Sequence, residues 1–378
     1  MKILNINSYY LSSTVHSEFE KALIERGHTL KTIVPIQNDY KVRDEVNAVV
    51  PEHVSIIECF NKIDRPFFGV KQKKIMQAIN KFSFDEFDLL HAHSLFTNGY
   101  IAYKVYKKFK TPYVVTVRDT DLNIFFKRMV HLRGAGLEIL KYASKVIFLS
   151  APYREQLIKK YIPNELKGHL EKKSVIIPNG INKFWLDNAN SAKTKDEKII
   201  KLIFAGNIIK RKNLERVIKA CDLIKLKGYK VEFQVVGKVL DKSVGRKLLN
   251  SDLVKLRGRV NKEELIKYYR ESQIFVMPSI TESFGLVYAE AMSQGMPVIY
   301  SKGQGFDGLF KEGEVGYSVD ALNIDDIKDK ILLVYDDYNK LSNKCIQNVD
   351  VFSWEKLVIH YENEYKGIMG VVNKELIS

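Results

Sequence analysis

The chain alternates short apolar segments with amphipathic ones, and it does so twice along its 378 residues. Apolar runs of strand length occupy residues 2–7, 87–93, 113–119 and 145–150 in the first half and 201–205, 231–237, 254–260 and 274–277 in the second. Strands that alternate with helices are typical of parallel sheets covered by helices. A chain of this length is also too long for one typical core. We therefore expect an α/β fold with two open, doubly wound parallel sheets.

Glycines and asparagines mark the predicted ends of several helices. Gly27 is expected to stop the first helix, and Gly228 to stop a helix that Asn213 caps. Asn261 is expected to cap a further helix. The polar, charged stretch 188–198 reads as the linker between the two domains.

Positive charge is in excess, and most of the excess lies in the first half. The formal net charge is +15, and residues 1–185 hold 29 Lys and Arg against 18 Asp and Glu. This favours an anionic partner, namely nucleic acid, a membrane surface or a phosphorylated substrate. A biased genome composition is the alternative, because lysine far outnumbers arginine.

Several classes of protein do not fit this sequence. No uncharged apolar run reaches the ~18 residues of a membrane span, and the first residues have no signal-peptide layout. The cysteines stand too far apart for a paired zinc or redox motif, so we expect three reduced thiols, Cys59, Cys221 and Cys345.

Two glutamates near the carboxyl end, Glu282 and Glu290, are separated by seven residues. The strand at 274–277 precedes them, Gly285 lies between them, and a helix is predicted over 286–294. A strand that turns through glycine into a helix presents unpaired backbone N–H groups at the carboxyl edge of the sheet, where a phosphate fits. The carboxylates would then bind hydroxyls on the two sides of a diphosphate, on a ribose and a sugar. The alternative is two solvated glutamates, since most glutamates are exposed.

The stretch Met277-Pro-Ser-Ile-Thr-Glu-Ser-Phe-Gly-Leu-Val-Tyr-Ala-Glu-Ala-Met resembles the donor-site signature of retaining glycosyltransferases of family 4, also called glycosyltransferase group 1. Segments 22–30 and 176–184, and the tail from Phe352, resemble other parts of that family. The resemblance therefore extends over nearly the whole chain.

That resemblance implies the GT-B fold, in which two Rossmann-like domains face a deep cleft. It implies an acceptor-binding domain at 1–187 and a nucleotide-sugar-binding domain at 188–350. The final segment, 351–378, would form a helix that crosses back to the first domain.

The resemblance assigns a diphosphate-binding role to Lys212, which follows the strand-end Gly206. The alternative is a surface lysine in a Lys-Arg-Lys run. Family members usually have an arginine directly after the glycine, where this chain has Asn207. Asparagine supplies no charge, so Lys210 or Arg211 is expected to compensate.

Further donor contacts are implied for the sugar, the ribose and the base. Glu290 would bind the ribose hydroxyls. The backbone of Arg259 and Val260 would read the base, unless these are ordinary strand-end residues. Gly237 receives only a structural role. The donor sugar and distal phosphate would be held by Glu282 and Ser283 and by the backbone of Phe284, Gly285 and Leu286.

The first domain departs more from the family. Where many members have two glycines, this chain has Ser12, Ser13 and Thr14, whose hydroxyls and N–H groups would donate to a phosphate or the acceptor.

Charged and imidazole side chains at predicted strand ends are further candidates in the first domain. Arg118 and Asp119 stand where many members have a histidine; they would contact donor or acceptor, or form a structural ion pair. His93 would face the acceptor cleft or be a buried structural histidine. His91 and His93 have spacing compatible with a metal pair, but no third ligand is evident.

We predict a hexosyltransferase that moves a sugar from a nucleotide diphosphate donor, most readily a UDP-sugar, to a hydroxyl with retention of configuration. The acceptor would be a saccharide or lipid-linked saccharide of bacterial surface polysaccharide or glycolipid synthesis. No cofactor and no metal is expected, because Lys212 and the helix beginning at Leu286 would stabilise the leaving diphosphate. The catalytic set would be Glu282, Lys212, Arg118, Asp119 and His93. The resemblance implies front-side displacement, with the leaving phosphate helping to deprotonate the acceptor.

Two other functions stay open. One is a transferase with a small soluble acceptor such as a sugar phosphate. The other is a non-catalytic basic module that binds membranes or nucleic acid, although no nucleic-acid-binding signature is present.

Two basic, aromatic stretches, 66–74 and 125–133, predict a docking surface for an anionic membrane. Phenylalanine enters the membrane interface while lysine and arginine stay at the headgroups. We therefore expect a cytoplasmic enzyme that is peripheral on the inner face of the plasma membrane. The alternative is that the phenylalanines are core residues and the lysines are merely solvated.

Overall fold

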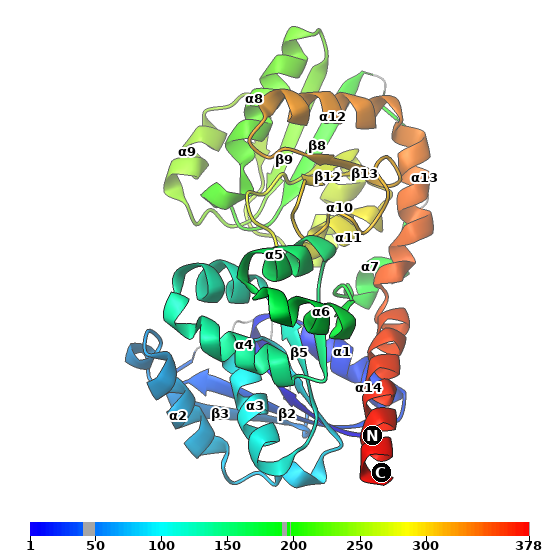
Figure 1. Ribbon diagram of the computed structural model, residues 1–378. Coiled ribbons are helices and arrows are strands. Elements are labelled where there is room, and N and C mark those ends of the chain that lie inside the picture. Colours follow the sequence, from blue (N-terminus) through cyan, green and yellow to red (C-terminus); the bar gives the residue numbers. More distant parts are fainter. Residues whose placement is uncertain (41–49, 191–194, 197, 378) are drawn as a thin grey trace. The chain divides into compact units, whose positions relative to one another are not determined.

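The structure is a computed structural model that describes residues 1–40, 50–190, 195–196 and 198–377 (Figure 1). Part of the predicted linker 188–198 therefore lies outside the described residues.

The chain forms two compact units. Unit 1 contains Met1–Leu149, Tyr153–Gly180 and Trp354–Ser378, and unit 2 contains Ser150–Pro152 and Ile181–Ser353.

Unit 1 is built on a seven-stranded parallel sheet with the order β3-β2-β1-β4-β5-β6-β7. The strands are β1 Lys2–Ile6, β2 Thr29–Gln37, β3 Val54–Phe60, β4 Leu89–Ala92, β5 Tyr113–Val117, β6 Lys145–Phe148 and β7 Ser174–Ile176. The central strands β4 and β5 are buried at every position, as expected for a parallel sheet with both faces covered.

The helices of unit 1 cover this sheet. They are α1 Val15–Glu25, α2 Phe68–Ile79, α3 Thr97–Phe109, α4 Arg133–Tyr142, α5 Ala151–Tyr161, α6 Asn164–Lys173 and α14 Trp354–Ile377. Short helical turns are η1 Tyr10–Ser12, η3 Lys62–Asp64, η4 Phe84–Glu86, η5 Asp121–Phe126 and η6 Val130–Leu132.

The C-terminal helix α14 packs alongside α1 of unit 1 (Figure 1). Its buried residues recur at helical spacing along one face: Trp354, Leu357, Val358, Tyr361, Tyr365 and Ile368. The Phe19 ring of α1 lies 5.6 Å from the Trp354 ring and 4.8 Å from the Tyr361 ring. The Arg26 guanidinium lies 2.6 Å from the Glu362 carboxylate. The predicted return of the C-terminal helix to the N-terminal domain is thus confirmed.

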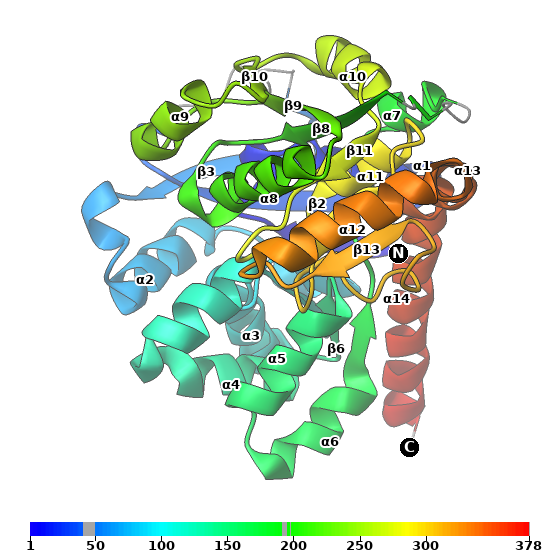
Figure 2. The same ribbon diagram turned by 90° about the horizontal axis from the view of Figure 1, so that it is seen from above.

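Unit 2 has a six-stranded parallel sheet with the order β10-β9-β8-β11-β12-β13. Its strands are β8 Ile199–Ala205, β9 Lys230–Val236, β10 Val254–Leu256, β11 Ile274–Val276, β12 Val298–Ser301 and β13 Gly316–Val319. Its helices are α7 Lys183–Asp187, α8 Leu214–Leu226, α9 Lys242–Leu249, α10 Lys262–Glu271, α11 Leu286–Met292, α12 Ile324–Asp336 and α13 Tyr338–Asn348, with the turns η7 Lys210–Lys212 and η8 Val349–Phe352. Helices α8 and α12 pack side by side against the sheet (Figure 2).

Most predicted helix ends are confirmed. Helix α1 ends just before Gly27, and α8 just before Gly228, and both glycines have positive φ. The Asn261 side chain accepts the backbone N–H of Glu264 and so caps α10. Asn213 stands at the start of α8 but does not cap it, because its left-handed backbone (φ 64°) directs the amide elsewhere.

Two predicted elements are shorter than expected. The strand predicted at 254–260 ends at Leu256, because Arg257 to Val260 turn through Gly258, which has positive φ. The helix predicted at 286–294 ends at Met292, so it has only seven residues.

Both sheets have the strand order of doubly wound folds, and such folds bind ligands where that order reverses. In unit 2 the reversal lies between β8 and β11, and in unit 1 between β1 and β4. Candidate site residues follow all four of these strands.

Candidate functional site

The switch point of unit 2 brings together two segments that are far apart in sequence. Lys212 follows β8, and Glu282 follows β11, which pairs with β8 in the sheet. Lys212 Nζ donates to Glu282 Oε2 and lies 3.3 Å from Met277 Sδ. Both charged residues are about nine-tenths buried, with 8% exposure each. The two residues predicted at the diphosphate and the sugar are therefore in direct contact.

Burial governs the charge state of this lysine. Loss of solvent lowers the pKa of Lys212, and the Glu282 carboxylate opposes that effect by favouring the ammonium form. The Glu282 carboxylate thus favours the charged form of a buried lysine in the segment that follows β8.

A second cation, Arg211, lies beside this pair. Its Nη1 donates to the Thr281 carbonyl oxygen at 2.7 Å and lies 3.6 Å from the Glu282 carboxylate. Asn207 and Lys210 are both exposed. Lys210 and Arg211 were the two residues predicted to compensate for Asn207. Of these, the structure shows a contact with the Glu282 loop for Arg211.

The Glu282 loop is held by a segment that the sequence did not reveal as functional. The Glu282 N–H donates to Gln304 Oε1 at 3.0 Å, and the Gly305 N–H donates to the Glu282 carbonyl at 2.8 Å. A Cβ added at Gly305 would lie 2.1 Å from the Ser283 carbonyl oxygen. In the sequence, the glycines on either side of Gln304, directly after β12, could have indicated this close approach.

The residues between the two glutamates have different environments. Phe284 is buried and packs 5.8 Å from Phe352, which leaves only its backbone for a ligand. Gly285 has φ 81°. Ser283, Leu286 and Glu290 are half-buried.

A close approach of two backbones fixes the loops after β8 and β9. The Gly206 N–H donates to the Val236 carbonyl, and a Cβ at Gly237 would lie 1.8 Å from the Gly206 carbonyl oxygen. Only glycine fits at 237, which accounts for the structural role predicted there. The neighbouring loop after β10 carries Arg259, which is exposed, and Val260, which is half-buried.

The first loop of unit 1 uses its hydroxyls locally. Ser12 Oγ donates to the Tyr9 carbonyl at 2.5 Å, and Ser13 Oγ accepts from the Val15 N–H at 3.3 Å. Thr14 is exposed, and its carbonyl accepts from Ser17 Oγ.

The histidines that end β4 are buried. His93 is 3% exposed, its Nε2 lies 3.3 Å from Asn5 Oδ1, and its ring stacks on His91 at 4.0 Å. His91 bonds Thr116 Oγ1 and the Tyr365 hydroxyl, both at 2.8 Å. Burial lowers the pKa of His91 to about 3 and that of His93 well below its usual range. These neutral, packed rings favour the structural alternative.

Arg118 and Asp119 bond to different partners. Arg118 Nε donates to the His93 carbonyl at 3.0 Å. The Asp119 carboxylate accepts from the Tyr153 hydroxyl at 2.7 Å and from Asn123 Nδ2 at 2.6 Å. Both residues are half-buried.

Asp121 is a structural residue that the sequence reading overlooked. Its carboxylate accepts the backbone N–H groups of Leu95, Phe96 and Arg118 at 2.8–3.1 Å. Burial raises the pKa of Asp121 to about 6, against these hydrogen bonds. This side chain ties the loop after β4 to the loop after β5.

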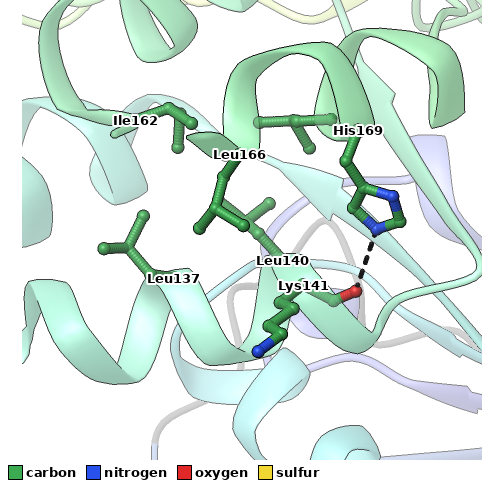
Figure 3. A pocket seen from close by; sticks show the side chains of 7 residues that line it. Leu137, Leu140, Lys141, Ile162, Leu166 and His169 are labelled. Carbon is green, nitrogen blue, oxygen red and sulfur yellow. Dashed lines mark hydrogen bonds between the residues drawn. The ribbon is translucent and has the colours of Figure 1, made fainter. Parts of the chain in front are cut away.

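Three further features concern the residues that the structure describes. No helix there combines the length and apolar character needed to cross a membrane. In the same ranges, no three His, Cys, Asp or Glu side chains are arranged to hold a metal ion. A small, largely apolar pocket between α4 and α6 is lined by leucines such as Leu137 and Leu166 (Figure 3). His169 Nε2 donates there to the Lys141 carbonyl, and none of the candidate residues lines it.

Comparison with known proteins bears on this arrangement. A family profile described as "Glycosyltransferase Family 4" matches residues 13–183, and one described as "Glycosyl transferases group 1" matches residues 187–351. An uncharacterized glycosyltransferase of Methanocaldococcus jannaschii is 25% identical over 97% of this chain and 98% of its own length.

Solved structures share the fold. A sucrose-phosphate synthase from Thermosynechococcus elongatus superposes with a TM-score of 0.75 at 19% identity, over 98% of this chain and all of that one. Anabaena HepE in complex with UDP and glucose superposes with a TM-score of 0.69 at 17% identity, over 97% of this chain and all of that one.

The two Rossmann-like sheets and the returning C-terminal helix define the GT-B fold, and the two family profiles make the chain a glycosyltransferase, an enzyme that takes its sugar from a nucleotide-sugar donor. Within that class, the chain belongs to glycosyltransferase family 4, the retaining group 1 enzymes.

Proposed function

We propose that the enzyme transfers a hexose from a UDP-sugar to a hydroxyl of a lipid-linked or free saccharide in surface polysaccharide or glycolipid synthesis. The observation that carries the donor side of this proposal is the contact between Lys212 and Glu282 at the switch point of unit 2. It joins a cation for the diphosphate to a carboxylate for sugar hydroxyls. The complex of Anabaena HepE with UDP and glucose supports uridine as the nucleotide.

The charges at this edge suit the departure of a diphosphate. As the bond to the sugar breaks, negative charge grows on the leaving phosphate, and fixed cations in a partly dry site stabilise it. Lys212 supplies the first cation and Arg211 the second. The two side chains carry full charges, whereas the N-terminus of α11 presents only about half a unit charge, so the side chains contribute most of this stabilisation. With these cations present, we propose that no metal is required.

The donor's remaining contacts follow the same loops. Glu290 would bind the ribose and Glu282 the sugar, while the backbone at Phe284 to Leu286 would donate to the distal phosphate. No described carboxylate is assigned as a nucleophile on the sugar. The proposal is front-side displacement, in which the leaving phosphate receives the acceptor's proton.

Thermal-shift measurement against UDP, GDP and ADP sugars tests the donor. A ligand that binds only the folded state raises the melting temperature. UDP-sugars should give the largest rise, and Glu290→Ala should lower the affinity for UDP about ten- to a hundredfold, because a charged hydrogen bond contributes about 1.5–3 kcal/mol. The matched control is Glu271→Ala, an exposed glutamate of unit 2. Unchanged UDP affinity in the Glu290 variant would refute the ribose role.

The acceptor side of the proposal depends on one surface of unit 1. The two predicted stretches meet in space, since the Phe68 and Phe125 rings lie 5.9 Å apart. In and next to these two stretches of the chain, five apolar side chains are exposed, Ile63, Phe67, Val70, Ile124 and Val130. The exposed basic residues beside them are Lys62, Arg65, Lys73, Lys127 and Arg128. We call this set the basic apolar surface.

The structure divides the predicted residues between core and surface. Phe68 and Phe126 are buried, whereas Phe67 is 61% exposed. Lys74 Nζ lies 2.8 Å from the Asp64 carboxylate, and Lys71 Nζ lies 4.8 Å from the centre of the Phe60 ring. Burial lowers the pKa of Lys71 to about 8. Membrane attraction therefore rests mainly on the exposed basic residues.

Co-sedimentation with liposomes tests this surface. Each basic residue near an anionic surface contributes about 1 kcal/mol, so a few suffice for reversible binding. Binding should require anionic lipid, weaken with salt, and fall when Lys73, Lys127 and Arg128 are changed to glutamate. Charge reversal of the exposed Lys227 and Lys230 in unit 2 is the control.

A failure to bind anionic liposomes at low salt would favour the soluble acceptor instead. The structural likeness to a sucrose-phosphate synthase supports that second candidate. Transfer to a sugar phosphate in solution would then be the assay of choice.

A further inference from the structure

In the proposed donor site, the Glu282 carboxylate already binds Lys212, the cation that we assign to the diphosphate. Lys212 Nζ has three protons to donate; it directs one to Glu282 Oε2 and has the Met277 thioether as a further neighbour. The side chains of Lys212 and Glu282 are each 10% exposed, so neither charge is well solvated. The bond is therefore a strong one that an incoming phosphate must share or displace.

The backbone that carries the Glu282 carboxylate is held by two hydrogen bonds. The Glu282 N–H is bonded to the Gln304 side chain, and the Glu282 carbonyl accepts the Gly305 N–H. The Arg211 guanidinium also attracts the carboxylate from 3.6 Å. A diphosphate that reaches Lys212 therefore arrives beside a fixed negative charge.

We propose that Glu282 makes the site select the intact sugar donor over the free nucleoside diphosphate, by opposing any anion at Lys212 that brings no sugar hydroxyls. This inference rests on the proposed donor site. The product UDP meets the carboxylate with phosphate charge alone, and two like charges on one cation repel. A UDP-hexose offers hydroxyl groups that donate to Glu282 and satisfy it. The same residue thereby weakens binding of the product and favours its release.

The size of the effect follows from the charges. Two unit charges about 4 Å apart repel by an amount that corresponds to about fivefold in affinity in water, and to far more at a partly buried site. Removing the charge with Glu282→Gln should therefore tighten UDP binding about tenfold, although it removes a side chain of the site. The affinity for UDP-glucose should rise less or fall, so the preference for donor over product should shrink.

Calorimetric titration of UDP and UDP-glucose into the full chain tests the inference. Glu290→Gln is the matched control from the same motif, and it should weaken UDP binding. In the double variant Lys212→Met/Glu282→Gln the gain from Glu282→Gln should disappear, because without Lys212 no cation holds the phosphate next to residue 282. Glu282→Ala provides a second variant with the same expected direction, and melting curves check that each variant is folded.

The outcomes separate the inference from the donor assignment. If wild type binds UDP and both Glu282 variants bind it equally or more weakly, the selection by Glu282 is refuted and the donor site stands. If the gain persists without Lys212, the ion pair is not its cause and the inference fails. If wild type binds none of UDP, GDP and ADP, the donor site itself is wrong and the inference fails with it.

Discussion

Both units have a reversal of strand order, but the side chains around the two reversals have different bonding partners. In unit 2, the loops after β8 and β11 bring Lys212, Arg211 and Glu282 together. In unit 1, the side chains after β4 and β5 bond the protein itself: Arg118 donates to the His93 carbonyl, and Asp121 accepts three backbone N–H groups. The comparison teaches that topology positions a site, while the partners of its side chains decide what is left for a ligand.

The first loops of the two units differ in the same way. After β8, Gly206 lies against Gly237 so closely that no side chain fits between the backbones. After β1, Ser12 and Ser13 fill the corresponding place with hydroxyls that bond to their own loop. The loops of unit 2 thus combine cations with two closely approaching backbones, whereas the first loop of unit 1 has hydroxyls that hydrogen-bond within the loop itself.

The largest effect is expected at Lys212, and it tests the contrast between the two units most directly. Lys212→Met should lower kcat about 100- to 1000-fold, as removal of one preorganised stabilising group does. Lys210→Met is the matched control, since this exposed lysine is two residues away, and it should change kcat less than about threefold. Initial rates with a UDP-sugar measure both variants.

Two results would contradict that prediction. One is a Lys212→Met enzyme with full activity. The other is wild-type turnover that EDTA abolishes and Mg²⁺ or Mn²⁺ restores, because a metal would then do the work assigned to Lys212.

Much of this site could be predicted from the sequence because its signals are local. Strand alternation predicted both sheets, and the spacing of Glu282 and Glu290 predicted a carboxylate on each side of a helix start. The contact between Lys212 and Glu282 could not be predicted, since it depends on which strands become neighbours. Asp121 and Gln304 were missed for the same reason: each holds a segment distant in sequence through backbone groups, and such bonds leave no pattern in the side-chain letters.

The buried histidines show a second limit of prediction from sequence. The spacing of His91 and His93 in a strand left open a metal pair or a site histidine. Their burial follows from packing against Phe19 and Tyr361, which lie on helices far away along the chain. Periodicity assigns a residue to a strand, but tertiary packing decides whether its polar atoms stay available.

An intermediate effect is expected at Gly305, which supports the Glu282 loop. Gly305→Ala should displace the loop, because the added Cβ would lie 2.1 Å from the Ser283 carbonyl. UDP-sugar affinity should fall about tenfold or more, in line with a misplaced charged contact. Gly303→Ala is the control: unlike Gly305, Gly303 has a positive φ (71°), but nothing lies within 4 Å of a Cβ added there. It should cost only about 1–2 kcal/mol of stability and leave affinity nearly unchanged. Equal losses of affinity in both variants would show that Gly305 has no special role.

The smallest effect is expected in a charge cluster of unit 1, to which we assign a role in stability only. Hydrogen bonding to Arg26 holds the pKa of Glu362 down to about 2, against an ordinary value of about 4.5. Because the folded pKa is the lower one, this carboxylate stabilises the docking of α14 above pH 4.5, and the stabilisation is lost as the pH falls towards 2. Glu362→Gln should lower the Tm by about 2–4 °C at neutral pH, and the difference from wild type should shrink as the pH falls below 4.5. The exposed Glu355 of the same helix provides the control, and Glu355→Gln should change the Tm little. Neither variant should alter UDP affinity. A Glu362 variant that binds UDP more weakly would show that this unit 1 cluster acts on the donor site after all, and the contrast between the two units would then fail.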